Sequence, residues 1–479
     1  MLVVPSRQDQ LHSYQYSLQR VVAALVTHDP DPHRSPLRRA GMTVLVGAVI
    51  ATLALGGTLV YGILTGTNTV ELRDESVVFL EKGSGARFVY LKTDDRLHPI
   101  INYSSGLLIA NSSEPKVVST SSDRLATMSL GEPLGIPDAP DSLPDADHLL
   151  PDDWTVCSQR AGDSPIAEPR SLLLVGDRIA GGNTLAAPPP GGKPQALLVS
   201  DALDRIYLVF GNRRFLVPGS RVQQTRTWFG WTEQPLPVAT GWLNAVPVGA
   251  DLQAPRIPRH GAPSPTMPNH RVGQLLRVSS DPNGSPTWGV VMADGVADLT
   301  EVQALLMRAA PEGAEPEDMD RTRYGNLPRS ATVLTAAAST AGFPATVPTL
   351  LDSARRVCVT SAENDSLTVR IDPAVPAGAP VRRADALPGG VQADLVHVPR
   401  GHGALVVSAA SPTAPATAGT VSVVTDTGVR YPIASRNLLG KLGYHDAKPV
   451  EVPAQLVSLL PQGPSLDPER ARRPVTASD

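Results

Sequence analysis

The chain has 479 residues, of which 42% are hydrophobic and 18% are charged, a composition that excludes a globally disordered protein. A net charge of −4 over this length leaves no broad basic field, which argues against nucleic acid as a partner. Proline is the outlier, with 47 residues where a share of about 5% is usual. Together with 40 glycines, it predicts short elements separated by many turns.

The first 40 residues contain one predicted amphipathic helix. Ser6 followed by Asp9 resembles a capping box, and two Asp-Pro pairs at 29–32 end the helix because the residue before proline avoids helical geometry. An apolar stripe recurs at steps of three and four residues, formed by Leu11, Tyr14, Leu18, Val21, Val22 and Leu25. A lone helix of this length is only marginally stable in water, so we expect another surface to pack against the stripe. The membrane surface is one candidate, but a polar face that is not lysine-rich favours a partner subunit.

A transmembrane helix is predicted over 41–65. No charged residue lies between Arg39 and Glu71, and the 23 residues from Met42 to Leu64 form the apolar centre. As a helix this run spans about 35 Å, enough to cross a bilayer core. A cleaved signal peptide has an apolar core of about 7–15 residues behind a short basic leader. The leader of about forty residues therefore favours an anchor.

The charges that flank the span predict its orientation. Three arginines precede it, and three carboxylates with one arginine follow it: Arg34, Arg38 and Arg39, then Glu71, Arg73, Asp74 and Glu75. Because basic residues stay on the cytoplasmic side, we expect a cytoplasmic N-terminus and a translocated region over 66–479.

The outer region contains four stretches with one plan, which is an apolar strand, a turn and a second strand. They lie at 88–101, 205–217, 287–299 and 419–433. Each has Gly, Asp or Asn where a tight hairpin needs a positive φ, and Asp294-Gly295 is the strongest of these signals. The first and last stretches are also followed by similar proline-rich segments. This pattern predicts internal repetition.

These signals divide the chain into a cytoplasmic segment (1–40), the transmembrane helix (41–65), four repeats (66–144, 196–255, 270–344 and 401–465) and a flexible C-terminal tail (466–479). The stretches 145–195 and 345–400 fit no repeat and are predicted to form the two parts of a core. The expected fold class is a single transmembrane helix followed by an extracytoplasmic β-rich α+β domain of four pseudo-repeats around a central core.

The two cysteines, Cys157 and Cys358, lie in the two core stretches, each within a short β-like run. An exact pair in an extracytoplasmic region favours a disulfide over two separate buried thiols. Such a bridge would close a loop of about two hundred residues, which stabilises by roughly 4–5 kcal/mol on the chain-entropy model.

No motif for catalysis or cofactor binding is present in the sequence. The nearest approach to an ATP-binding loop is Gly191-Gly192-Lys193, but Pro194 follows it and Ala187 stands where the first glycine is needed. Neither a G-x-S-x-G elbow nor an H-E-x-x-H helix occurs, and the ten histidines lack metal-ligand spacing. We therefore predict no catalytic residue, no cofactor and no metal site.

Several short motifs along nearly the whole chain are similar to those of one family. They lie at 20–38, 97–108, 135–140, 154–157 and 459–466. With them the chain resembles EccB, a membrane component of the type VII (ESX) secretion system of mycobacteria and relatives. Ser105-Gly106 stands where Ser-Ala is usual, and the segment before the span is less basic than in many relatives. These departures leave the ESX subtype open.

The resemblance implies a structural or assembly subunit of the inner-membrane core complex, whose periplasmic domain, with a disulfide in its core, forms part of the translocation assembly. It implies the membrane components EccC, EccD and EccE as partners, contact with the mycosin protease, and self-association through the periplasmic domain. Some relatives carry an ATPase label, so a membrane-anchored hydrolase with weak ATPase activity is the alternative. The missing nucleotide-binding loop favours the structural role.

Overall fold

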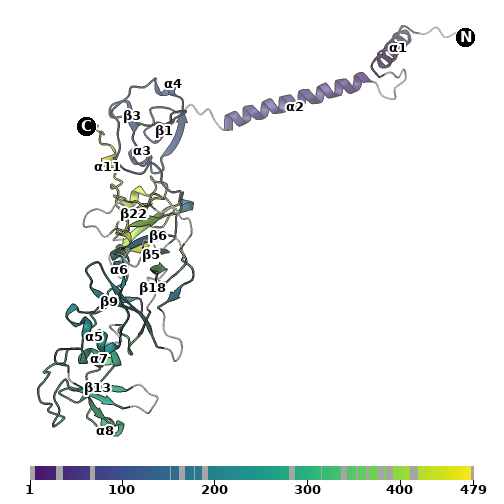
Figure 1. The fold of residues 1–479 in the computed structure, drawn as a ribbon. Coiled ribbons are helices and arrows are strands. Elements are labelled where there is room, and N and C mark those ends of the chain that lie inside the picture. Colours follow the sequence, from purple (N-terminus) through teal and green to yellow (C-terminus); the bar gives the residue numbers. More distant parts are fainter. Residues whose placement is uncertain are drawn as a thin grey trace. The chain divides into compact units, whose positions relative to one another are not determined.

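The computed structural model describes residues 6–27, 36–64, 71–151, 153–160, 168–176, 179–185, 193–279, 286–313, 315–335, 342–351, 354–362, 366–375, 382–383, 392–409 and 419–475 (Figure 1). The chain divides into two compact units, Met1–Glu71 and Leu72–Asp479.

The first unit consists of two helices, α1 (Arg7–Thr27) and α2 (Pro36–Leu64). The predicted start of α1 is confirmed, because the Asp9 N–H donates to Ser6 Oγ at 3.3 Å and the Ser6 N–H donates to Asp9 Oδ2 at 3.1 Å. The Asp-Pro pairs expected to end α1 lie outside the described residues. Helix α2 starts earlier than predicted, at Pro36, since proline is well suited to the first turn of a helix, where its missing N–H has no partner to lose.

A seven-stranded sheet lies in the second unit, and both stretches that fit no repeat contribute strands to it. Its strand order is β19-β20-β6-β5-β17-β18-β7. The strands from the first stretch are β5 (Trp154–Arg160), β6 (Pro169–Val175) and β7 (Asn183–Thr184). Those from the second are β17 (Arg356–Ala362), β18 (Ser366–Ile371), β19 (Arg382–Arg383) and β20 (Leu395–His397). The central pair, β5 and β17, is antiparallel and joins the two stretches directly.

Four smaller sheets share one topology. In each, three consecutive antiparallel strands are followed by a fourth strand that pairs in parallel with the first. The first sheet comprises β1 (Val77–Glu81), β2 (Arg87–Leu91), β3 (Arg96–Ile100) and β4 (Lys116–Thr120). The second comprises β8 (Gln195–Ser200), β9 (Ile206–Phe210), β10 (Arg213–Leu216) and β11 (Leu236–Pro237). The third comprises β12 (Leu275–Val278), β13 (Thr287–Val291), β14 (Val296–Leu299) and β15 (Glu317–Met319). The fourth comprises β21 (Ala404–Ala409), β22 (Val421–Val424), β23 (Arg430–Pro432) and β24 (Val450–Pro453).

Short helical segments occupy the same two places in each of these units. Between the third and fourth strands lie α3 (Tyr103–Ile109), η2 (Gly219–Arg221) with α5 (Val222–Phe229), α7 (Glu301–Arg308) and η4 (Arg436–Leu438). After the fourth strand come α4 (Ser122–Leu125), α6 (Thr240–Ala245), α8 (Arg321–Gly325) and α10 (Ala454–Val457). A parallel connection needs such a crossover because the chain must return to the end of the sheet from which it started.

Each unit then has a closing bridge, at an equivalent position on the outer side of its third strand. The bridged pairs are parallel: Leu97 with Leu130, Arg214 with Val248, Val296 with Arg329, and Arg430 with Gln462. In every case the third-strand residue donates its N–H to the carbonyl before its partner and accepts from the N–H after it, at 2.7–3.0 Å. We call each complete unit a repeat, numbered one to four in chain order.

The residue after each bridge partner is small for a steric reason. It is glycine in repeats one, two and four, at Gly131, Gly249 and Gly463. An added Cβ would lie 2.2 to 2.4 Å from the bulky side chain that covers each glycine, respectively His98, Phe215 and Tyr431. In repeat three the covering position holds Ala297 and the position after the bridge holds Ser330. In repeat three, a smaller covering side chain therefore leaves room for a residue larger than glycine after the bridge.

Figure 1 shows the order in which the sheets of the second unit follow one another, and shared hydrophobic clusters join the neighbouring sheets. One cluster joins the first and fourth sheets, and another joins the fourth sheet, the seven-stranded sheet and the second sheet. A third cluster packs α7 of repeat three against the second sheet. The first and last repeats are therefore neighbours, although they are far apart in the sequence.

The structure differs from the expected domain boundaries at two places. Residues 466–475 are not a flexible tail, because they contain α11 (Pro468–Ala471) and bury Leu466 and Ala471 completely. Residues 476–479 lie outside the described residues. The start of the second core stretch instead adds β16 (Thr349–Leu350) to the second sheet, where it pairs in parallel with β8.

Candidate functional site

The cysteine pair lies at the centre of the seven-stranded sheet. Cys157 on β5 is directly opposite Cys358 on β17, and a disulfide joins them with their Cα atoms 4.0 Å apart. Both cysteines are fully buried, and they pack with Leu172, Leu174 and Ile179. The predicted pairing is therefore present in the structure. Its burial suits a permanent staple between two halves of the sequence and not a reactive thiol pair, which would need access to solvent.

Polar side chains that the sequence did not single out reinforce the same sheet. The hydroxyls of Thr155 and Thr360 lie 3.0 Å apart across β5 and β17. Elsewhere in the sheet, Asp394 accepts from the Ser171 N–H at 2.7 Å and from the Ser171 hydroxyl at 2.8 Å. No spacing rule links residues more than two hundred positions apart, so these contacts could be recognised only once the strands had been paired.

Helix α2 carries the predicted membrane anchor, including both of its expected end residues, Met42 and Leu64. Its window Gly41–Thr58 has a mean hydropathy of 1.8, and none of its residues is buried inside the protein. The 29 residues of α2 span about 44 Å, more than the hydrocarbon core of about 30 Å. Within the described part of the chain, this is the one helix long and apolar enough to cross a membrane.

The apolar stripe of α1 is exposed in the structure. Leu11, Tyr14, Leu18, Val21 and Leu25 are each more than half exposed, and Val22 is half-buried. Exposure of five large apolar side chains on one helix is unfavourable in water, so we expect another apolar surface to bury them.

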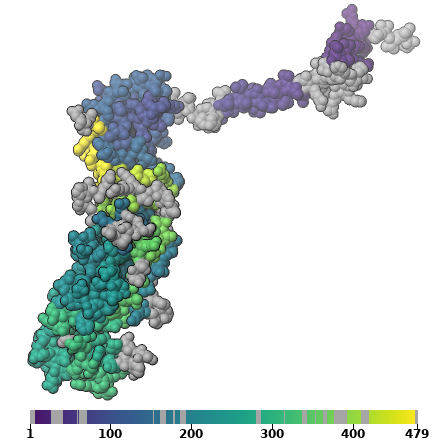
Figure 2. Space-filling view, viewed as in Figure 1, coloured from purple at the N-terminus to yellow at the C-terminus, as the bar shows by residue number. Residues whose placement is uncertain are grey.

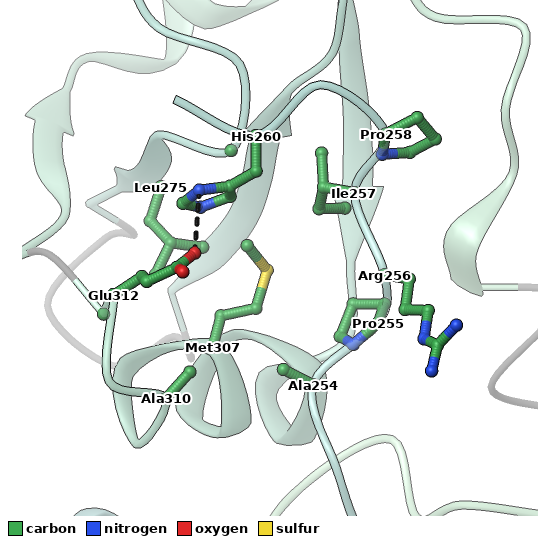
Figure 3. A pocket seen from close by; sticks show the side chains of 12 residues that line it. Ala254, Pro255, Arg256, Ile257, Pro258, His260, Leu275, Met307, Ala310 and Glu312 are labelled. Atoms are coloured by element: carbon green, nitrogen blue, oxygen red, sulfur yellow. Dashed lines mark ion pairs between the residues drawn. The ribbon is translucent and has the colours of Figure 1, made fainter. Parts of the chain in front are cut away.

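A cavity in the described part of the chain lies in repeat three, between the segment 254–260, β12 and α7. It encloses about 510 Å³, and its walls are mostly apolar (Figure 3). Ile257 and Pro258 form one side, and Met307 and Leu275 line the interior. At the other side, His260 Nδ1 lies 3.2 Å from Glu312 Oε2.

At its α7 end this cavity has the wrong polarity for a nucleotide phosphate. It adjoins the C-terminal end of α7, where the carbonyl oxygens of Met307, Arg308 and Ala310 gather around Gly313. A helix C-terminus is the negative end of the helix dipole, whereas phosphate sites use the N-terminus. The carboxylate of Glu312 adds further negative charge at the rim.

The lining of this cavity includes none of the titratable groups for which a pKa shift is found in the described residues, and one such group, Tyr324, ties strands of repeat three together. Burial, with the nearby Asp298 carboxylate, raises the pKa of Tyr324 to about 12. The Tyr324 hydroxyl donates to Asp298 on β14 at 2.6 Å, and Arg329 also pairs with Asp298. Because Arg329 is the closing-bridge residue of repeat three, this triad fastens the bridge to the sheet. The described residues contain no group of three His, Cys, Asp or Glu side chains able to hold a metal ion.

The tryptophans do not form one binding patch. Trp231 meets the ring of Phe229 edge-on, with centroids 4.7 Å apart, and Trp228 lies 3.7 Å beneath the Arg308 guanidinium. Trp242 is fully buried in a different cluster, shared with the seven-stranded sheet. These side chains therefore belong to the packing of repeat two against repeat three and against the seven-stranded sheet.

One apolar helix able to span a membrane, followed by four similar sheets around a disulfide-joined sheet, defines a single-pass, membrane-anchored β-rich protein. The family model described as type VII secretion system ESX-1, transport TM domain B, matches residues 3–476. The chain belongs to this family, the EccB family.

Curated relatives match over nearly the whole chain. The ESX-3 secretion system ATPase EccB3 of Mycolicibacterium smegmatis is 27% identical, over 95% of this chain and 88% of the relative. The ESX-1 secretion system ATPase EccB1 of the same species is 26% identical, over 96% of this chain and 94% of the relative.

Solved structures share the fold. A chain of an intact ESX-5 inner membrane complex matches with a TM-score of 0.66 and 22% identity, covering 100% of this chain and 97% of that one. The EccB3 dimer from the ESX-3 core complex matches with a TM-score of 0.62 and 26% identity, covering 83% and 99% respectively.

Proposed function

We propose that this chain is a structural and assembly subunit of the inner-membrane core complex of a type VII secretion system. The observation that carries the proposal is the architecture, in which one span is joined to four similar sheets held around a disulfide-stapled core. In this architecture the Tyr324–Asp298–Arg329 triad and the Thr155–Thr360 contact serve strand pairing. The second unit would form part of the translocation assembly.

The partners follow from the family. Solved relatives come from an ESX-5 inner membrane complex and from an EccB3 dimer, which supports self-association through the second unit. Assembly with EccC, EccD and EccE, and contact with a mycosin protease, rest on the family resemblance. The exposed stripe of α1 supplies a surface on which a partner helix can pack.

The proposed orientation places the N-terminus in the cytoplasm and the second unit in the periplasm, because arginines precede the span and carboxylates follow it. Ser13 and Ser113 are both exposed and lie on opposite sides of α2 in the sequence. In intact spheroplasts, a membrane-impermeant thiol reagent should label Ser113→Cys and should reach Ser13→Cys only after permeabilisation. Labelling of Ser13→Cys in sealed spheroplasts would reverse the topology.

The relatives' names carry an ATPase label, so the rival function is an anchored hydrolase. We propose that this chain does not hydrolyse ATP, since the sequence lacks a phosphate loop and the cavity in repeat three adjoins the negative end of a helix. Titration of the detergent-purified full chain with ATP should give no saturable binding in the micromolar range. Saturable binding with turnover that is lost in His260→Ala would establish the hydrolase instead.

A further inference from the structure

The last described residues of the chain leave repeat four and lie on repeat one. At the start of this segment, Leu466 bridges to Ile433 of repeat four. At its end, Pro474 forms an antiparallel bridge with Leu134 of repeat one, and the Val475 N–H donates to the Pro133 carbonyl at 2.9 Å. Figure 2 shows these C-terminal residues, in yellow, against the surface of repeat one, in blue.

The segment between these ends is specified as structure by its own residues. The Asp467 side chain accepts from the Glu469 N–H at 2.9 Å, and Pro468 occupies the first position of α11. An Asp cap followed by proline is a strong helix start. The fully buried Leu466 and Ala471 belong to the cluster that joins the first and fourth sheets.

Two cations from the far end of the chain complete helix α3 of repeat one. Residues 104–109 of α3 are all buried, and its C-cap Ala110 has φ −54°, so no left-handed residue satisfies its last carbonyls. The Arg472 Nη2 donates to the Ile109 carbonyl at 3.2 Å. The Lys441 Nζ donates to the carbonyls of Leu108 and Ala110. Cations are favourable at this negative end of a helix.

We propose that residues 466–475 form a strap that locks repeat one onto repeat four, with Arg472 as the clamp on α3. Repeat one is the repeat that directly follows the membrane helix, so the strap fastens the anchored end of the second unit to the rest of it. The strap also covers the outer edge of the first sheet at 133–134, and an open sheet edge is a site where another strand can pair.

Hydrogen exchange of the detergent-purified full chain tests the strap. Arg472→Glu replaces the cation that donates to the Ile109 carbonyl with an anion, which the negative end of α3 repels. Arg473→Glu is the matched control, because it makes the same charge change on the neighbouring residue, which is exposed as Arg472 is. In Arg472→Glu we expect the amides of Val475 and of the C-terminal end of α3 to exchange about tenfold faster, which corresponds to a local loss of about 1.4 kcal/mol. The Arg473→Glu chain should exchange like the wild type, and the amides of β5 and β17 should be unchanged in both variants.

A chain that ends at Ser465 gives a second readout. It should show fast exchange in α3 and at the Leu134 amide while β5 and β17 stay protected. Wild-type exchange of α3 in Arg472→Glu would overturn the clamp, whether or not the shortened chain accumulates. Equal acceleration of α3, β5 and β17 in Arg472→Glu would also overturn the proposal, because the segment would then support the whole unit and not one junction.

Discussion

At the scale of single residues, the closing bridges couple a small residue to the side chain that covers it. Gly249→Ala would place a Cβ 2.4 Å from the ring of the fully buried Phe215, and overpacking of this kind costs about 1–3 kcal/mol. The free energy of unfolding should fall accordingly in chemical denaturation. Gly219→Ala in the same repeat is the control, since an added Cβ there meets no atom within 4 Å.

The coupling between the two positions can be measured separately. In a Phe215→Leu background, Gly249→Ala should cost less than it does in the wild type, because the obstructing ring is gone. A double-mutant cycle in which the two costs simply add would show that the glycine is not required by the ring above it.

Tyr324 gives a residue-scale prediction for alkaline pH. Its pKa is raised from 10.0 to about 12, mainly by burial and then by Asp298. A raised pKa in the folded state means that the contribution of Tyr324 to stability is fully present below pH 10 and is lost as the pH rises toward about 12. The difference in tyrosinate absorbance between wild type and Tyr324→Phe should therefore titrate near pH 12. A difference curve centred near pH 10 would contradict the buried triad.

At the scale of elements, the hairpins could be predicted and the crossovers could not. The expected turns contain Asp95, Asn212, Gly295 and Gly428, all with positive φ, because only a few residue types tolerate that conformation. The parallel fourth strands carry no such signal. For example, β15 (Glu317–Met319) has the composition of a solvated loop and becomes a strand only by pairing with β12. These fourth strands form because they pair with segments that are distant in the sequence.

The disulfide joins strands β5 and β17, and its removal should affect stability more than membrane insertion. Cys157→Ser should lower the thermal midpoint of the second unit, since opening a loop of 201 residues costs roughly 4–5 kcal/mol on the chain-entropy model. Cys358→Ser should cost the same and the double change little more, because each removes the same bond.

Membrane insertion should survive these cysteine changes, because α2 and its flanking arginines are untouched. Non-reducing peptide mapping of the wild type is the direct check on the bond itself. Recovery of Cys157 and Cys358 as two free thiols from protein taken from the oxidising side would refute the staple.

At the scale of the whole molecule, the span and the pairing of the two cysteines across the core could be predicted from the sequence, but the strap could not. The span is recognisable because so long an apolar run without charge is rare outside a membrane. The strap resembles a tail because its charged and proline residues surround only two fully buried ones, Leu466 and Ala471. Their burial depends on repeat one, more than three hundred residues earlier, so no local pattern reports it.

The central claim is that this chain is an assembly subunit in the membrane, and the mass of the particle it forms tests that claim most directly. An affinity-tagged full chain should be extracted from native membranes in mild detergent and weighed by native mass spectrometry. We expect a particle many times heavier than the 50.4 kDa chain, containing other membrane components of the secretion system. A single 50.4 kDa species with no associated protein would contradict the account.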